Sequence, residues 1–249
     1  MNEILAVGLQ SMQGDMARLE QVAMNLANTL TPGYKRGITS QAAVGGSFAS
    51  QLGALENASA EGTPVAPVRL DSVTDSRIGT LKFTGQSLDV ALAGKGYFEV
   101  MTDSGPAYTR NGSFHLDARG RLVNDKGLAV MGTGGEITLG AGAAVIDANG
   151  TIRTSAAGDA VTLARLKVLE FDGAGALTRL GEGLFAPAPG MKQVEESQVR
   201  QGYLENSNVN STHEMTQLIQ SMRHFETMQK VVQGYDEMLG AAIRKLGET

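Results

Sequence analysis

The sequence of 249 residues carries a net charge of −5 and contains no cysteine. The lack of Cys excludes disulfides, thiolate catalysis and Cys-ligated zinc, and the acidic balance gives no support for nucleic-acid binding, which needs a basic surface. With 32 glycines, 5% aromatic and 19% charged residues, the composition is typical of a turn-rich β protein rather than a compact helical enzyme.

The first thirty residues predict an amphipathic helix within the segment 1–36. Apolar residues recur at alternating spacings of four and three, which is the heptad pattern of a coiled coil. Pro32 disfavours helix at the residue before it, so Thr31-Pro32-Gly33 is expected to end the helix. Acidic Glu3 and Asp15 lie where a secretory signal needs a cationic start and an apolar run. The apolar stripe comprises Leu5, Leu9, Met12, Met16, Leu19, Ala23, Leu26 and Leu30.

Residues 37–78 are rich in Ala, Ser, Gly, Thr and Gln and show no sustained hydrophobic period. Such a composition is typical of a connector without a core of its own. The sequence therefore predicts an extended linker over 37–78.

The segment 79–200 predicts a β-rich domain. A motif of the form apolar, Asp, two residues, Gly, one residue, apolar recurs at 116–122, 146–152 and 171–177. Asp accepts hydrogen bonds from a turn and Gly adopts a positive φ, so each copy predicts a β-hairpin. Asp147 to Gly150 also resembles part of a calcium loop, but such a loop needs a later bidentate Glu. Residues 151–154 contain no acid, which favours the turn.

The segment 201–249 predicts a second amphipathic helix, which the capping-box pair Ser211 and Glu214 begins. The usual interpretation of one such stripe is packing on the core of its own domain. Two narrow stripes at the two ends of one chain favour pairing into a coiled-coil domain that makes subunit contacts. The second stripe comprises Met215, Leu218, Met222, Phe225, Val232, Leu239 and Ile243.

No arrangement of residues in the sequence predicts catalysis. His213 and His224 share the C-terminal helix about 16 Å apart, too far to hold one metal ion, and His115 falls on an expected strand. The glycine-rich stretches lack the spacing of a phosphate-binding loop, and no G-x-S-x-G elbow is present. We therefore expect no enzyme, and no catalytic residue, metal or cofactor.

Residues 25–35 resemble the signature N-[LI]-A-N-x-x-T-x-G-[FY]-K of the flagellar rod and hook axial proteins. Segments 89–98, 108–114 and 202–210 resemble three further blocks of that family. The size and the short linker are most similar to the proximal-rod type, next to the distal-rod type, and less to the longer hook proteins. The matched signature positions are Asn25, Ala27, Asn28, Thr31, Gly33, Tyr34 and Lys35.

The resemblance implies a mainly β central domain and an inner coiled-coil domain of paired N- and C-terminal helices. It also implies a structural subunit that stacks helically into the torque-transmitting rod of the basal body, across the periplasm. The implied partners are copies of itself, other axial rod proteins, and the type III export apparatus with its chaperoning components. Export would need no cleaved signal, and neither nucleic acid nor membrane insertion is expected. Three alternatives stay open: a distal-rod or hook-type subunit, a β-rich ligand-binding module, and an enzyme assembled from unmarked residues.

Overall fold

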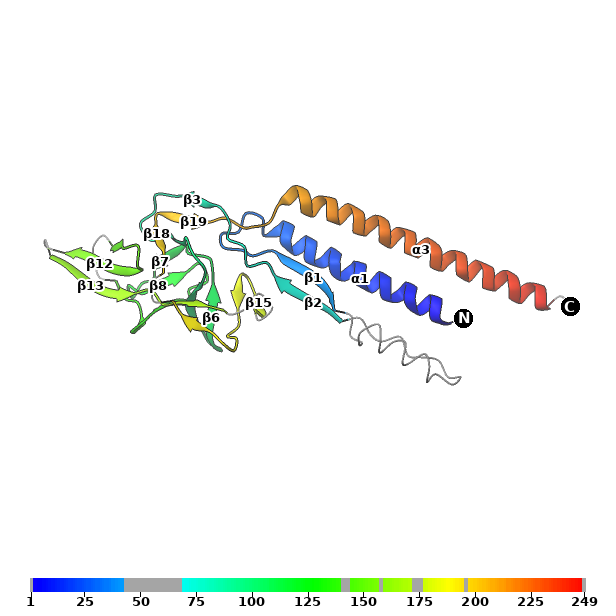
Figure 1. Ribbon diagram of the computed structural model, residues 1–249, viewed down its shortest axis with the longest axis horizontal. Helices are drawn as coiled ribbons and strands as arrows, with labels where there is room; N and C mark the ends of the chain where they lie inside the picture. The colour runs from blue at the N-terminus through cyan, green and yellow to red at the C-terminus, as the bar shows by residue number, and fades with distance from the viewer. Residues whose placement is uncertain are drawn as a thin grey trace. The chain divides into compact units, whose positions relative to one another are not determined.

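A computed structural model describes residues 2–42, 69–139, 144–156, 159–171, 177–194 and 197–247 (Figure 1). The chain divides into two compact units. The first comprises Met1–Leu26, Gly37–Val73 and Ser211–Thr249, and the second comprises Ala27–Arg36 and Thr74–Asn210. Residues 27–36 and 201–210, which the sequence assigns to the helical ends, thus belong to the second unit.

Two helices form most of the first unit and confirm the two helical ends that the sequence predicts. Helix α1 spans Asn2–Ala27 and helix α3 spans Ser211–Gly247, with 26 and 37 residues. They pack side by side in opposite directions, because Asp15 contacts His224 whereas Asn25 contacts Glu214 (Figure 1). No helix within the described ranges is long and apolar enough to cross a membrane.

Helix α1 ends earlier than its apolar stripe predicts. After Ala27 the backbone N–H of Thr31 donates to the carbonyl of Asn28 at 3.2 Å, and the Thr31 hydroxyl donates to the Asn28 side chain at 3.1 Å. Such local side-chain bonds offer the backbone an alternative to the helix. Leu30 therefore lies beyond the helix, where it is 94% exposed, and does not continue the stripe.

The expected linker contains paired strands at both of its ends. Strands β1 (Gly37–Ala42) and β2 (Arg69–Thr74) form a two-stranded sheet beside α1 (Figure 1). Side chains of α1 bind both strands, since Asn25 bonds to Gly37 and Gln21 accepts a hydrogen bond from Ser72. Residues 43–68 of the expected linker lie outside the described residues.

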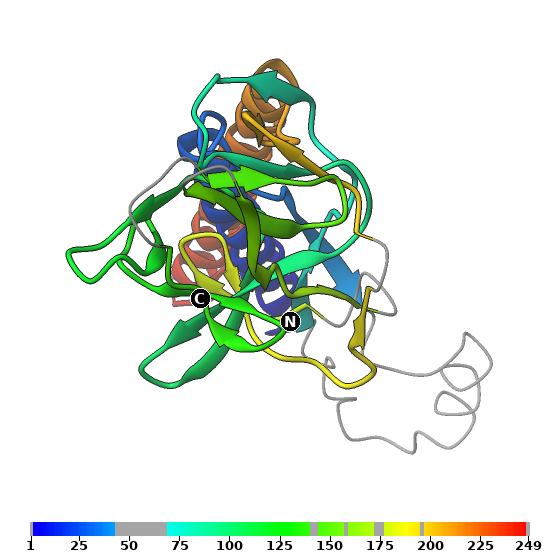
Figure 2. The ribbon, with the colours of Figure 1, turned by 90° about the vertical axis from the view of Figure 1, so that its left-hand side faces the viewer.

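The second unit is built from short strands, and its largest sheet has ten strands among the described residues. Seven of them follow in the order β15-β16-β6-β5-β9-β8-β7, while β10 and β14 pair with members of this path and β17 pairs with β14. Figure 2 shows strands running in several directions rather than in one flat layer. The strands are β3 (Leu81–Phe83), β4 (Val90–Leu92), β5 (Tyr97–Thr102), β6 (Gly105–Thr109), β7 (Phe114–Leu116), β8 (Leu122–Asn124), β9 (Ala129–Gly132), β10 (Gly135–Glu136), β11 (Ala144–Ile146), β12 (Thr151–Ala156), β13 (Asp159–Arg165), β14 (Val168–Glu170), β15 (Arg179–Gly181), β16 (Leu184–Phe185), β17 (Lys192–Gln193), β18 (Val199–Gln201) and β19 (Tyr203–Glu205).

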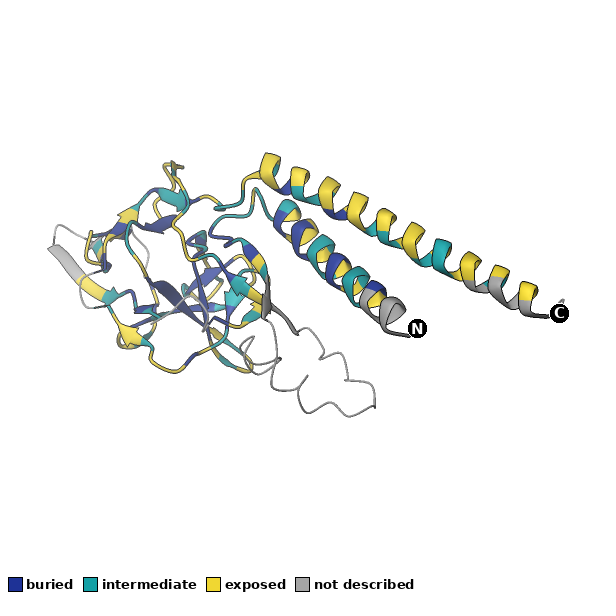
Figure 3. Cartoon of the chain, turned by 45° about the vertical axis from the view of Figure 1, so that its right-hand side comes forward, coloured by how far each residue is buried: buried dark blue, intermediate teal, exposed yellow. Residues whose placement is uncertain are grey.

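The core of this unit is mainly aliphatic. Its side chains include Leu92, Phe98, Leu122, Ile137 and Ile152, all of which are essentially inaccessible to solvent. Buried positions are concentrated in the strands, whereas α3 is exposed along most of its length (Figure 3). The β unit therefore has a core of its own, as the predicted β-rich domain requires.

Two of the three predicted hairpin turns form as expected. Asp117 accepts hydrogen bonds from the backbone N–H groups of Arg119 and Arg121, both at 2.8 Å, and Gly120 has a φ of +76°. In the second turn the N–H of Gly150 donates to the carbonyl of Asp147 at 2.9 Å. The Asp147 carboxylate pairs with Arg153 at 2.6 Å, which favours a turn over a calcium loop. Residues 172–176 of the third copy lie outside the described residues.

Candidate functional site: buried polar networks at the signature motifs

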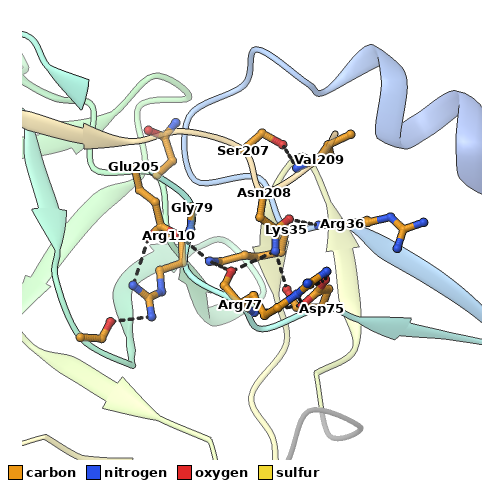
Figure 4. Close-up of polar contacts among 12 residues, drawn as sticks. Lys35, Arg36, Asp75, Arg77, Gly79, Arg110, Glu205, Ser207, Asn208 and Val209 are labelled. Atoms are coloured by element: carbon orange, nitrogen blue, oxygen red, sulfur yellow. Dashed lines mark hydrogen bonds and ion pairs between the residues drawn. The ribbon is translucent and has the colours of Figure 1, made fainter. Parts of the chain in front are cut away.

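Three segments far apart in the sequence meet at one buried carboxylate in the second unit (Figure 4). Glu205 on β19 accepts hydrogen bonds from Lys35 Nζ at 2.5 Å, from Arg110 Nη1 at 3.1 Å and from the backbone N–H of Gly79 at 2.8 Å. The three charged side chains are at most 3% exposed. The Lys35, Arg110 and Glu205 side chains are called the charge cluster below.

The backbone completes the charge cluster. Lys35 Nζ also donates to the carbonyl of Arg77 at 2.7 Å, and Arg110 Nη2 donates to the carbonyl of Gly94 at 2.9 Å. Burial lowers the pKa of Lys35, an effect that Glu205 opposes and the Arg110 charge reinforces. A buried ion cluster of this kind stabilises a fold only while all its partners remain. The geometry is therefore that of a buried salt-bridge network that stabilises the fold, not that of a reactive group.

Gly33 of the signature passes directly over the backbone that carries Arg110. Its φ is +68°, and a Cβ at this position would lie 2.3 Å from the carbonyl carbon of Arg110 and from the nitrogen of Asn111. The N–H of Gly33 donates to the carbonyl of Glu205 at 2.7 Å. The signature needs glycine here because the turn and the close approach both exclude a side chain.

Two polar side chains bind the residues on either side of Lys35. Asn208 accepts from the N–H of Arg36 at 2.7 Å and donates to the carbonyls of Asp75 and Arg77 at 3.0 and 2.9 Å (Figure 4). Arg179 lies over the ring of buried Tyr34, with its guanidinium carbon 5.0 Å from the ring centroid. Segment 27–36 is thereby attached to three other parts of the unit.

Acid is expected to weaken the second unit through Asp75. The bidentate hydrogen bonds from Arg77, at 2.6 to 3.0 Å, are the main reason that the pKa of Asp75 is lowered. A lowered folded-state pKa stabilises the fold above the unfolded value of about 3.9, and this contribution is lost as the pH falls below it. Asp75→Asn should therefore be less stable than the wild type at pH 5, and the difference should shrink at pH 3. Urea unfolding of both proteins at pH 5 and at pH 3 measures this difference in the free energy of unfolding. A difference that stays constant with pH would contradict the assignment.

A second polar network lies in the first unit and includes the first signature residue. Asn25 Nδ2 donates to the carbonyl of Gly37 at 2.9 Å and to Glu214 Oε2 at 3.0 Å, while the N–H of Gly37 donates to Asn25 Oδ1 at 2.9 Å. The amide of Asn25 thus pairs with β1 as another strand would. Asn25 and Glu214 are buried, so this network connects α1, β1 and α3.

The two helices also share a polar contact. Asp15 is 1% exposed, and its Oδ2 lies 2.5 Å from Nδ1 of His224 on α3. Arg18, one turn further along α1, approaches the same carboxylate at 3.5 Å. The face that α1 turns inward therefore carries polar side chains as well as apolar ones.

The predicted seam residues fall into three groups. Met16 on α1 is 60% exposed and Met222 on α3 is 50% exposed, although both are apolar. Leu9, Ala23 and Met215 are also exposed, whereas Met12, Leu19, Leu26, Leu218, Phe225 and Val232 are half-buried. The backbones of Leu5, Leu239 and Ile243 lie in the helices, but their side chains lie outside the described ones.

The remaining candidates lie at the surface or in the turn after α1. Ala27 is exposed, and Asn28 and Thr31 bond to each other. His115 is exposed on β7. Within the described ranges, no three His, Asp or Glu side chains group as metal ligands would.

Arg110, Glu205 and Glu214 carry the polar networks but were not singled out as site residues from the sequence. The available signal for Arg110 and Glu205 was their position inside blocks that resemble the axial proteins, and for Glu214 it was the capping box at the start of the second helix. Only the folded structure shows that separate blocks supply partners to one another.

Comparison with known proteins agrees with these motifs. Residues 200–245 match the family model described as "Flagellar basal body rod FlgEFG protein C-terminal", and residues 91–159 match "Flagellar hook protein FlgE/F/G D1 domain". The chain is 32% identical to the flagellar basal-body rod protein FlgF of Rhizobium meliloti, over 98% of this chain and 97% of that protein. It is 34% identical to FlgF of Escherichia coli over 88% of each chain. It is 28% identical to the rod protein FlgG of Bacillus subtilis over 93% of this chain and 94% of the relative. The chain therefore belongs to the family of flagellar basal-body rod proteins that includes FlgF and FlgG.

Proposed function

We propose that the chain is a structural subunit of the bacterial flagellar basal-body rod and assembles through its two terminal helices. The observation that carries this proposal is the set of apolar side chains that α1 and α3 leave exposed after pairing with each other. Met16 on α1 and Met222 on α3 represent it. Exposed apolar stripes mark interaction surfaces, and the family comprises structural rod proteins rather than enzymes.

The spacing of the stripes supports coiled-coil contacts between neighbouring subunits. Residues at alternating intervals of four and three lie along one narrow line of a helix, which another helix can cover. A contact between unlike surfaces of identical subunits does not close on itself and gives an open helical filament. Such a filament can transmit torque, because each subunit is held by contacts on several sides.

The proposed partners and location follow the family. They are copies of this chain, other axial rod proteins and the type III export apparatus with its chaperoning components. The chain would be exported without a cleaved signal, and the assembled rod would span the periplasm. Neither nucleic-acid binding nor membrane insertion is part of the proposal. Size and the short linker favour the proximal-rod type that FlgF represents, and a distal-rod position is the alternative.

Replacement of Met16 by Glu tests the seam. The added charge would be buried without a partner at a subunit contact, so we expect flagellated cells that make only Met16→Glu to assemble no complete rods. Electron microscopy of isolated basal bodies measures this. The matched control is Gln13→Glu, which adds the same charge at an exposed polar position of α1 and should leave rods intact.

Circular dichroism of both purified variants must show unchanged folding, because Met16 is mostly exposed in the single chain. Rods in wild-type numbers from the Met16→Glu strain would exclude this seam as the assembly surface. Loss of rods in both variants would show that added charge, and not the apolar stripe, is responsible.

A further inference from the structure

The second unit contains a cavity of about 250 Å³. Its wall includes the side chains of Ser76, Lys95, Tyr97, Arg110 and Glu170, together with Phe171. Two cationic groups, one carboxylate and two aromatic rings therefore surround a space large enough for a small polar group. Convergent polar groups in a partly apolar cavity are the usual composition of a binding site.

Arg110 is incompletely satisfied beside this cavity. Its two terminal nitrogens bond to Glu205 and Gly94, but its Nε is buried and has no hydrogen-bond partner among the described residues. The side chain is 3% exposed. A buried donor without a partner costs about 1–3 kcal/mol, so the Nε–H of Arg110 is a donor that an acceptor in the cavity would satisfy.

The charge balance identifies the kind of acceptor. The charge cluster combines the cations Lys35 and Arg110 with a single carboxylate, that of Glu205, and all three are buried. Both cations donate to the same carboxylate, so within the charge cluster two positive charges face one negative charge. A guanidinium stays protonated and prefers carboxylate acceptors, so a second negative group is favoured next to Arg110.

The rim of the cavity can adjust to such a group. Lys95 is 82% exposed and lies 3.5 Å from Glu170, which is itself partly exposed. Pairs of this kind contribute at most about 1 kcal/mol, so the lysine can leave Glu170 for an incoming anion. Glu170 also repels negative charge, which favours a singly charged carboxylate over a doubly charged phosphate.

We propose that this cavity binds a carboxylate group, with Arg110 Nε and Lys95 Nζ as donors and the rings of Tyr97 and Phe171 as walls. The carboxylate belongs to an Asp or Glu side chain of another protein chain or to a small free anion. The proposal concerns the β unit alone and does not depend on rod assembly.

Nuclear magnetic resonance of the full chain provides the test, with sodium acetate as the probe. We expect the Nε–H resonance of Arg110 to shift and saturate with acetate, and not with sodium chloride at matched ionic strength. A capped peptide with one central Glu is titrated in parallel. Tighter binding of the peptide than of acetate assigns the carboxylate to a protein side chain, and equal binding assigns it to a free anion.

Variants at the rim of the cavity test the proposal without substitution of Arg110, which the fold itself needs. Lys95→Gln should weaken acetate binding and Glu170→Gln should strengthen it, each by about two- to five-fold. The matched control is Lys126→Gln, which removes another exposed lysine that pairs with a glutamate, Glu182, and should change nothing. The proposal is overturned if acetate and chloride shift Arg110 equally, or if all three variants bind acetate as the wild type does. Neither result would affect the rod function.

Discussion

Glu205→Gln is expected to lower the free energy of unfolding of the β unit by about 3–5 kcal/mol. The substitution keeps the shape of the side chain but removes its charge. Lys35 and Arg110 would then lie buried within reach of one neutral amide, where their charges repel each other. Urea unfolding followed by tyrosine fluorescence measures the loss, since four of the five tyrosines lie in this unit.

The control for this prediction is Glu182→Gln. Glu182 forms an exposed pair with Lys126 at 2.9 Å in the same unit, and removal of such a pair costs at most about 1 kcal/mol. A double-mutant cycle with Lys35→Met separates the pairwise coupling from the effect of each substitution alone. Similar losses for Glu205→Gln and Glu182→Gln would mean that burial adds nothing to the charge cluster.

Gly33→Ala is expected to destabilise the β unit by about 3–5 kcal/mol, since a positive φ and overpacking both contribute. The new Cβ would lie 2.3 Å from backbone atoms of Arg110 and Asn111. A backbone atom cannot rotate away as a side chain can, so segment 27–36 would have to move. That movement would also disturb the bond from the Gly33 N–H to Glu205. Urea unfolding with the same fluorescence signal measures the effect.

Gly127→Ala separates the two causes. Gly127 has a φ of +76°, close to the +68° of Gly33, but no atom lies within 4 Å of its Cβ position. It should therefore show only the backbone strain, about 1–2 kcal/mol. Equal losses in both variants would show that the close approach of Gly33 to Arg110 contributes nothing.

Local sequence patterns predicted the elements that depend on local physics. The apolar periods gave the two helices, and the Asp-to-Gly spacing gave the turns at Asp117 and Asp147, because a few neighbouring residues determine each structure. The end of α1 was less predictable, since the bond between Thr31 and Asn28 stops the helix before Pro32 does.

Contacts between distant residues had no local signal. Lys35 and Glu205 are separated by 170 positions, and nothing near either one indicates that they pair. Polar side chains of α1 bind both β1 and β2, and no hydrophobic period in this part of the sequence predicted these contacts. Resemblance to a family marked several of these positions but did not give the reason for them.

The charge cluster also restricts the order in which the chain can fold. Joining positions 35 and 205 closes a loop of 170 residues, with an entropic cost of roughly 4–5 kcal/mol. A chain that leaves the ribosome N-terminus first must therefore wait for β19 before segment 27–36 can dock. Until that moment Lys35 stays in water, and segment 27–36 has no carboxylate on which to dock.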